Sequence, residues 1–378
     1  MSNTVAKHIE QISTIVANRF EEVNVRYIQL MAKHISDIGA LTATDIHRLD
    51  EMAKMQANID EINNMLARAT DKSVLEIQMI FKKSGMLEYS DMAKYYLAKN
   101  IIQPTFFENT VINNYMKSMA MATGNTFRNI SHTTAISQDY RNAVDSIIQE
   151  VTTGMADYKS VTRRIINKTV SNGLRVVYAS GLTRRLDSAL KLNLIEGIRR
   201  LNSGIREEAG KQFGADGVQI DAHGLCAEDH LPYQGKQFTL KGFNKLQSSL
   251  KRPIGTMNCQ HNISYIVLGV SPNPYSAQEL QQMKDYSQEM IEVNGKKYTR
   301  YDCTQVMRRL ETRMRYEKEK IIGLKSANQD IGKEKERLSI LEASYRHITN
   351  KSGVKPRFDN AYVPNYKGRQ IKPKQVKI

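Results

Sequence analysis

The sequence predicts a mainly α protein with one small α+β domain, and three observations support this fold class. Aromatic residues make up 7% of the 378 residues and Trp is absent, which argues against a large β-sandwich. The first proline is Pro104, so every earlier residue keeps the backbone N–H donor that a helix needs. Apolar residues recur at steps of three and four over long stretches, and only two short runs resemble strands.

The N-terminal helical region is assigned to residues 1–155. Residues 5–38 form one amphipathic stretch that ends at Gly39, and a second stretch begins at Thr42 or Thr44, which predicts a helical hairpin of long helices. Further helices are expected to start near Asp71, Asp91, Pro104 (as a first-turn proline) and Ser137.

The α+β core domain is assigned to residues 156–275. The apolar periodicity predicts helices over 157–170 and 186–201. Short apolar runs predict strands at 218–220 and 263–270, and the second run is apolar enough to be buried on both faces.

A charged helical arm is assigned to residues 276–349. Ser276 and Glu279 have the spacing of a capping box at a helix start. After a turn at Gly295, apolar residues at heptad spacing run among many charged residues, which predicts a coiled coil or a helical hairpin. Breaks in the repeat, such as Gly332, favour packing against a neighbour over one long coil.

A basic extended tail is assigned to residues 350–378, where eight Lys or Arg accompany one acid, Asp359. Such a tail either follows a nucleic acid backbone, with its tyrosines stacking on bases, or lies across a neighbouring subunit. The candidate nucleic-acid-binding residues are Lys351, Lys355, Arg357, Tyr362, Tyr366, Lys367, Arg369, Lys372, Lys374 and Lys377.

The composition also limits which kinds of partner and cellular compartment are expected. The formal net charge is +16, enough for the summed field of the protein to attract a polyanion such as double-stranded DNA. The longest apolar runs are far shorter than a membrane span, and the N-terminus lacks the pattern of a signal peptide. The sequence has three cysteines, a small and odd number that does not suit a disulfide framework. This cysteine content fits a reducing compartment.

One cluster of residues has the chemistry of a site: His223, Cys226, His230, Cys259 and His261. Imidazole and thiolate groups are the usual ligands of structural zinc, so zinc is one hypothesis for these five residues. The two-residue step from Cys259 to His261 would place both on one face of a strand.

Two other interpretations of this cluster stay open. The histidines could bond to carboxylates such as Asp221 or Asp229 in a small core, with the cysteines packed as apolar groups. A thiol–imidazole enzyme is the third interpretation, although nothing in the sequence supplies the oxyanion donors or a third catalytic member.

Other charged motifs are interpreted as solvated surface. Glu317-Lys318-Glu319 resembles the paired glutamates of ADP-ribosyl transfer, but in a charged helix such residues are expected to face solvent. The pairs Arg184-Arg185 and Arg199-Arg200 suit phosphate or carboxylate partners, yet a solvated helix face is favoured. The sequence has no P-loop and no Gly-rich dinucleotide turn, and an enzyme is not expected.

The stretch from Gly173 to Ser271 resembles the minor capsid proteins of the second type found in tailed phages. The matching segments are Leu174–Gly181, Leu186–Ala189, Gly214–Val218, Ala222-His223, Pro232–Lys236, Arg252–Gly255, Asn258–His261 and Leu268–Ser271, followed by Lys297–Thr299 and Arg308–Glu311. These segments occur in the same order as in the family, which is more specific than any single motif.

The resemblance implies a structural, non-enzymatic component of the phage head, assembled in the host cytoplasm and placed near the portal or in the head interior. It implies the portal protein and the major capsid protein as partners in an oligomeric virion. The positive charge adds packaged DNA as a further partner. The alternatives are a DNA-binding internal head protein delivered with the genome, and a metal-dependent or thiol enzyme at the His/Cys cluster.

Overall fold

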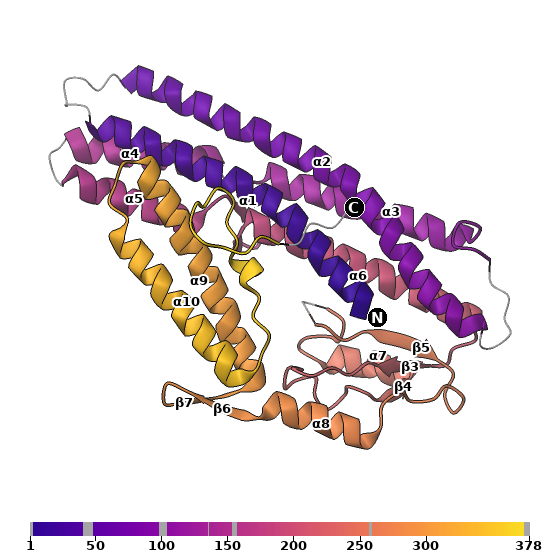
Figure 1. The fold of residues 1–378 in the computed structure, drawn as a ribbon. Helices are drawn as coiled ribbons and strands as arrows, with labels where there is room; N and C mark the ends of the chain where they lie inside the picture. Colours follow the sequence, from indigo (N-terminus) through magenta and orange to yellow (C-terminus); the bar gives the residue numbers. More distant parts are fainter. Residues whose placement is uncertain are drawn as a thin grey trace.

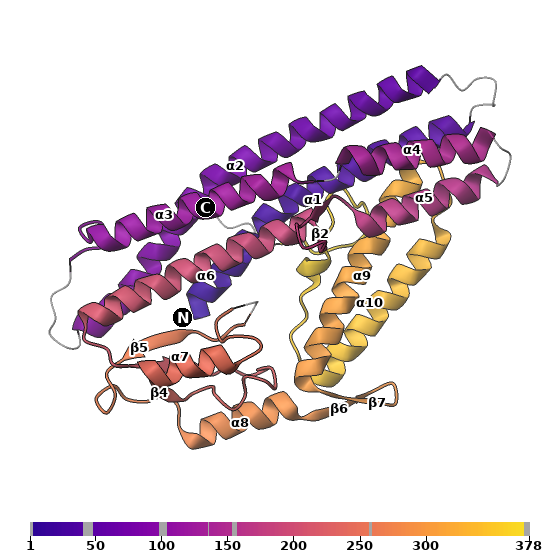
Figure 2. The same ribbon diagram turned by 180° about the vertical axis from the view of Figure 1, so that it is seen from behind.

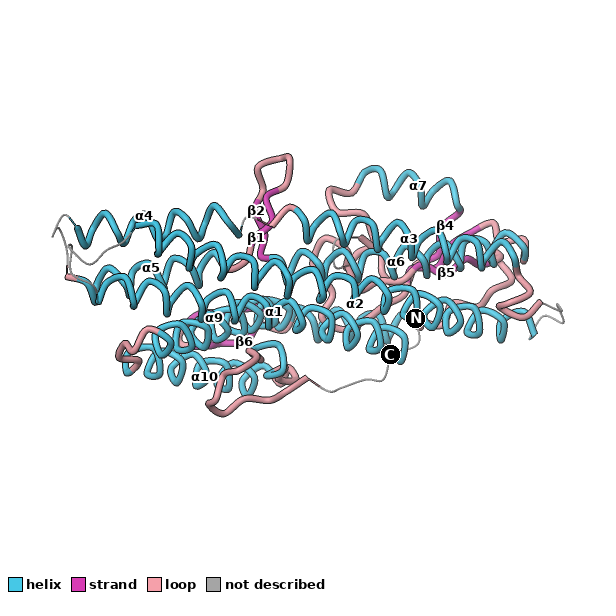
Figure 3. Tube along the Cα trace, turned by 90° about the horizontal axis from the view of Figure 1, so that it is seen from above, coloured by secondary structure: helices cyan, strands magenta, loops and turns pink. Residues whose placement is uncertain are grey.

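The computed structural model describes residues 3–40, 48–97, 104–134, 136–152, 157–256 and 259–373. An elongated body of long helices runs across the molecule, and a small sheet unit and a helical hairpin lie along one side of it (Figures 1 and 2). Viewed from above, strands are few and short beside the helices (Figure 3). The mainly α fold with a small α+β part is therefore confirmed. None of the described helices is both long and apolar enough to span a membrane.

The helical body has one continuous hydrophobic core. Its helices are α1 (Asn3–Ala40), α2 (Arg48–Leu97), α3 (Thr110–His132), α4 (Ile136–Thr152), α5 (Tyr158–Asn172) and α6 (Leu186–Gln212). Edge-to-face ring pairs cross this core between Phe20 and Phe127 and between Tyr27 and Tyr140. The side chains of α5 and α6 belong to the same core as those of α1 to α4. How the chain divides into folding units at residues 155, 275 and 349 stays a prediction.

Two expected helix starts are wrong because tertiary burial continues a helix through them. Helix α2 passes without a break through Asp71 and Asp91. Around Asp71 the apolar stripe continues from Leu66 to Val74, both of which are buried, so the exposed aspartate caps nothing. The helix expected at Pro104 begins instead at Thr110, as detailed below, while the helix expected near Ser137 is α4. The predicted starts at Thr42 and Thr44 lie outside the described residues.

Helix α3 starts late because its cap lies five residues beyond Pro104. The Asn109 side chain accepts a hydrogen bond from the Ile112 backbone N–H at 3.2 Å, which satisfies one of the free donors of the first turn. Pro104 therefore belongs to the preceding connection, where its carbonyl accepts a hydrogen bond from the Tyr89 hydroxyl at 2.7 Å.

The sheet unit is built around one fully buried strand. Strand β3 (Gly217–Ile220) lies between β4 (Gln237–Thr239) and β5 (Ile263–Ile266), antiparallel to both, and α7 (Leu240–Ser249) follows β4. The prediction that residues 263–270 form a strand buried on both faces is wrong. Strand β5 is a partly exposed edge that ends at Ile266, because the central position belongs to β3 and Gly269 (φ +72°) turns the chain beyond it.

The arm is a helical hairpin preceded by a β-hairpin. The capping box of Ser276 and Glu279 is present at the start of α8 (Ala277–Gln288). The elements that follow are β6 (Met290–Val293), β7 (Lys296–Thr299), α9 (Arg300–Ser326) and α10 (Gly332–Ser352). Asn294 and Gly295 both have positive φ, as a tight two-residue hairpin turn requires.

The basic tail is folded back on this hairpin instead of extending freely. A short 3₁₀ turn, η1 (Phe358–Ala361), packs against α9, and Val363 is buried against Val25 of α1 and Ile322 of α9. The Tyr345 hydroxyl donates to Glu311 at 2.7 Å and accepts from the backbone N–H of Arg357 at 2.8 Å. The described part of the tail therefore closes the hairpin core.

A buried ionic network around Arg185 joins α1, α6 and α9. Arg185 ends β2 (Thr183–Arg185), which pairs with β1 (Arg175–Val177) just before α6. Its guanidinium donates to Glu319 at 2.9 and 3.0 Å, to Glu21 at 3.0 Å and to Asp187 at 3.3 Å. Arg315 donates to the second oxygen of Asp187 at 3.1 Å.

This network overturns two surface assignments. Arg185 was expected on a solvated face, yet it is 8% exposed, whereas Arg184 beside it is exposed. Glu317, Lys318 and Glu319 are all buried, because α9 is covered by α1, α5, α10 and the tail. Glu319 faces Arg185, and the Lys318 ammonium donates to the Ala361 carbonyl at 2.6 Å.

The charges of the network nearly cancel when one carboxyl keeps its proton. Burial raises the pKa of Glu21 well above its ordinary value of 4.5, and nearby Glu319 raises it further against the pull of Arg185. For Asp187, burial is outweighed by Arg185 and Arg315, and its pKa falls to about 2. The guanidinium ions of Arg185 and Arg315 then face three carboxyl groups, and Glu21 is the one for which burial favours the neutral form.

We expect Arg185→Leu to destabilise the fold strongly, because it leaves Glu319 buried without its partner and leaves Asp187 with Arg315 alone. The expected cost is about 3–5 kcal/mol. Urea denaturation followed by far-UV circular dichroism measures it, and Arg184→Leu is the matched control, since that arginine is exposed. Equal midpoints for the two variants would contradict a structural role for the network.

We expect Glu21→Gln to gain stability relative to the native sequence as the pH rises. The folded-state pKa of Glu21 is raised, so above about pH 4.5 the unfolded chain releases a proton that the folded chain retains. Glutamine mimics the neutral acid and has no such pH dependence. The difference in thermal midpoint between the two proteins should widen between pH 5 and pH 8, and a constant difference would show that Glu21 is ionised when folded.

Candidate metal centre in the histidine and cysteine cluster

The cluster forms where two loops of the sheet unit meet. One loop, residues 221–236, follows β3, and the other, residues 259–262, leads into β5. The Asp221 carboxylate joins them by accepting from the backbone N–H and the side-chain amide of Asn262 at 2.6 and 2.8 Å. Because the last residue of β3, Ile220, pairs with the first residue of β5, Ile263, both loops leave the same end of the two strands and their side chains converge.

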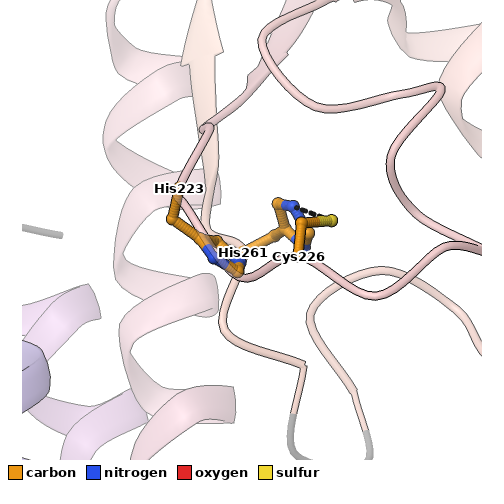
Figure 4. A group of neighbouring side chains, drawn as sticks. All are labelled: His223, Cys226 and His261. Atoms are coloured by element: carbon orange, nitrogen blue, oxygen red, sulfur yellow. Dashed lines mark hydrogen bonds between the residues drawn. The ribbon is translucent and has the colours of Figure 1, made fainter. Parts of the chain in front are cut away.

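All five predicted residues are brought together, with His261 at the centre. The Nε2 atom of His261 lies 3.5 Å from the Cys226 sulfur, and its Nδ1 atom lies 3.2 Å from the Cys259 sulfur. The Cys259 sulfur is also 3.3 Å from Nδ1 of His230. The His223 ring lies 4.4 Å from the His261 ring, centroid to centroid (Figure 4).

Two sets of three ligand atoms result, and they share His261. One set is His223, Cys226 and His261, and the other is His230, Cys259 and His261; within each set the ligand atoms lie within 4.8 Å of one another. The Cys259 sulfur lies 3.2 Å from Nδ1 of His261, but the prediction that both residues lie on one face of a strand is wrong, because both precede β5.

Backbone carbonyls orient two of the rings. Nδ1 of His223 lies 2.9 Å from the Gly224 carbonyl oxygen, and Nε2 of His230 lies 2.8 Å from the Arg252 carbonyl oxygen. A carbonyl oxygen only accepts, so each of these nitrogens carries the hydrogen. The other nitrogen of each ring therefore presents a lone pair to the cluster, the arrangement that metal-binding histidines use.

The carboxylates nearby are not hydrogen-bond partners of these histidines, contrary to one of the interpretations above. Asp221 bonds to Asn262, and Asp229 forms a two-pronged ion pair with Arg252 at 2.6 and 3.1 Å. Asp229 comes only to 3.7 Å from Nε2 of His230. The histidines instead bond to backbone carbonyls and to cysteine sulfurs.

The electrostatics do not favour a thiolate–imidazolium pair. Burial raises the pKa of Cys226 to about 12 and also raises that of Cys259. Burial and the neighbouring His223 and His230 lower the pKa of His261 to about 3. At neutral pH and without a bound cation the thiols are protonated and His261 is neutral, the opposite of an activated nucleophile.

The candidate tail residues are not gathered into one site. Tyr366 packs beneath the Lys318 ammonium, 5.5 Å from its ring centroid, Tyr362 is partly buried, and Arg357 pairs with Glu10. The exposed basic side chains among the described candidates are Lys351, Lys355, Lys367, Arg369 and Lys372. Lys374 and Lys377 lie outside the described residues.

Sequence reasoning missed a second basic surface, on α9. Arg308, Arg309 and Arg313 are exposed and line an open hollow of about 450 Å³ with Gln305 and Thr312. An adjoining hollow of about 330 Å³ continues it through Arg313 to Arg337 of α10. The helical spacing of 308, 309 and 313, opposite the buried Met307 and Met314, is the signal that could have revealed it.

Comparison with known proteins identifies the family. No curated protein and no solved structure matches the chain. A family model described as phage minor capsid protein 2 matches residues 6–350, which include the helical body, the sheet unit and the helical hairpin. The match covers nearly the whole chain, so this protein belongs to the phage minor capsid protein 2 family.

Proposed function

We propose that the protein acts as a structural part of the phage head and docks on the portal protein or the major capsid protein through the outer face of α2. The family supports a role in the head. The single observation that carries the docking proposal is an apolar stripe on that face, formed by Leu75, Met79 and Met86, with Phe107 beside it.

The stripe lies on the side of α2 that faces away from the core. Leu75 is 64% exposed and Met79 is 51% exposed, whereas Ile77 and Phe81, on the opposite side, are fully buried. Lys82 lies between Met79 and Met86 on the same side of the helix, and its ammonium lies over the Phe107 ring, 5.2 Å from the ring centroid. Exposed apolar groups in a row mark contact surfaces, and methionine suits a partner surface to which it must adapt.

Contact with packaged DNA is a second candidate function, favoured by the arginine hollow of α9. The described residues provide no ion pair for Arg308, Arg309, Arg313 or Arg337. Arginines at helical spacing that lack acidic partners can bind successive phosphates of a duplex backbone. This surface adds to the exposed lysines of the tail and is rigid, since it is built on a packed helical hairpin.

We expect Leu75→Ser combined with Met79→Ser to abolish co-purification with the portal protein or the major capsid protein while leaving the fold intact. Both side chains are exposed, so the core loses nothing. Met290→Ser is the matched control, because Met290 is 58% exposed but lies on the β6–β7 hairpin. Unchanged co-purification of the double variant from co-expressing cells would place the docking surface elsewhere.

We expect Arg308→Gln, Arg309→Gln and Arg313→Gln together to weaken binding to double-stranded DNA and to flatten its salt dependence. The slope of log affinity against log salt should fall by about one unit for each phosphate that the variant no longer neutralises. Fluorescence anisotropy at several salt concentrations measures both quantities.

A second triple variant separates the hollow from the tail: Lys367→Gln, Arg369→Gln and Lys372→Gln. Weaker binding confined to this variant would assign DNA contact to the tail. No binding by the unmodified protein at low salt would remove DNA from its partners.

A further inference from the structure

We propose that His223, Cys226 and His261 bind one zinc ion, with Gln234 or a water molecule on the fourth side, and that this ion fastens the two loops of the sheet unit together. The proposal is independent of the docking and DNA surfaces, which lie on other elements. It selects one of the two sets of ligand atoms that share His261.

A chain of hydrogen bonds makes the selection. His230 donates from Nε2 to the Arg252 carbonyl, so its Nδ1 atom can only accept, and the Cys259 thiol lies 3.3 Å away to donate to it. With its hydrogen used in this way, the Cys259 sulfur is left as an acceptor for Nδ1–H of His261 at 3.2 Å. Each group in this chain is then satisfied, and Nε2 of His261 is left with a lone pair.

The lone pair of His261 Nε2 lies close to other hydrogen-bond acceptors, and the cluster has too few hydrogens to satisfy all of them. His261 Nε2 lies 3.5 Å from the Cys226 sulfur and 3.3 Å from the side-chain oxygen of Gln234. His223 Nε2 is buried and has no hydrogen-bond partner among the described residues. The Cys226 thiol hydrogen can serve one acceptor, and the Ala227 carbonyl competes for it at 3.2 Å. A buried acceptor without a donor is costly, and a cation at this point satisfies every lone pair.

The geometry suits zinc. Bond lengths of about 2.3 Å to sulfur and about 2.0–2.1 Å to nitrogen in a tetrahedron place the two ligand atoms about 3.5 Å apart. The observed separation of the Cys226 sulfur and His261 Nε2 is 3.5 Å. One thiolate and two imidazoles form a ligand set that binds zinc in preference to calcium or magnesium, which favour oxygen ligands. Figure 4 shows the three side chains converging from the two loops.

The outer contacts support the same site. Gly224 holds the His223 ring through Nδ1, and Cys259 holds the His261 ring through Nδ1, so both metal-facing nitrogens are Nε2. Gln234 accepts from the His223 backbone N–H at 3.3 Å and turns the same oxygen toward His261. On binding, zinc replaces the hydrogen of the Cys226 thiol, and that proton leaves to solvent.

The test compares Cys226→Ser with Cys259→Ser in the full-length protein. After removal of metal with a chelator and reloading with zinc, we expect native mass spectrometry to show one zinc per chain in the unmodified protein. Cys259→Ser keeps a hydrogen-bonding group beside His261, so it should still bind one zinc, about 10–100-fold more weakly. Cys226→Ser removes the thiolate ligand and should lose the ion.

Cobalt loading gives a second measurement that reports the sulfur ligand directly. The thiolate-to-cobalt absorption band should be present in the unmodified protein and in Cys259→Ser, and absent in Cys226→Ser. His223→Gln extends the test to a partly exposed residue whose replacement spares the core, and His347→Gln, on the exposed face of α10, is its control.

Two results would overturn the proposal. Less than stoichiometric zinc in the unmodified protein at saturating metal would show that the cluster is a metal-free polar core. Zinc and the cobalt band retained in Cys226→Ser but absent from Cys259→Ser would assign the ion to the set that contains His230.

Discussion

The buried guanidinium of Arg185 fixes how the helical hairpin sits on the helical body, because an ion in the interior is tolerated only when its partners are in place. These partners come from α1, α6 and α9, which are distant in the chain. The three helices must therefore meet in one arrangement before the charge is compensated. Apolar side chains around the network can repack with modest losses, whereas the guanidinium permits few alternatives.

The same network explains where the positive charge of the protein appears. Three of the four acidic residues of α9 are used in the interior: Glu319 binds Arg185, Glu311 binds the Tyr345 hydroxyl and Asn360, and Glu317 pairs with Lys320. The arginines on the outer face of α9 form no ion pair with any of the described residues, and part of the +16 net charge is concentrated there. Interior packing and surface charge are two consequences of one distribution of residues along this helix.

The sheet unit is stabilised in a different way from the helical body. Its own apolar core is small, with Val218, Ile220, Phe243, Ile254 and Cys259 as the buried members, and its loops are long relative to its strands. Small cores of this kind commonly depend on an additional crosslink. The His/Cys cluster lies where such a crosslink would hold both loops. The unit also rests on α6, where Tyr265 packs so closely against Gly210 that an added Cβ would lie 2.5 Å from the tyrosine.

Features that depend on near neighbours could be predicted from the amino-acid sequence alone: the helical class, the cap at Ser276, the five members of the His/Cys cluster and the resemblance to the family. Helix periodicity, capping and hairpin turns involve residues a few positions apart, so they can be recognised along the chain. The burial of Arg185 and Glu319, the passage of α2 through Asp71, the edge position of β5 and the folded-back tail emerged only from the packing of the whole chain. Burial of a charge depends on partners far away in sequence, since Glu21 and Glu319 are 164 and 134 positions from Arg185.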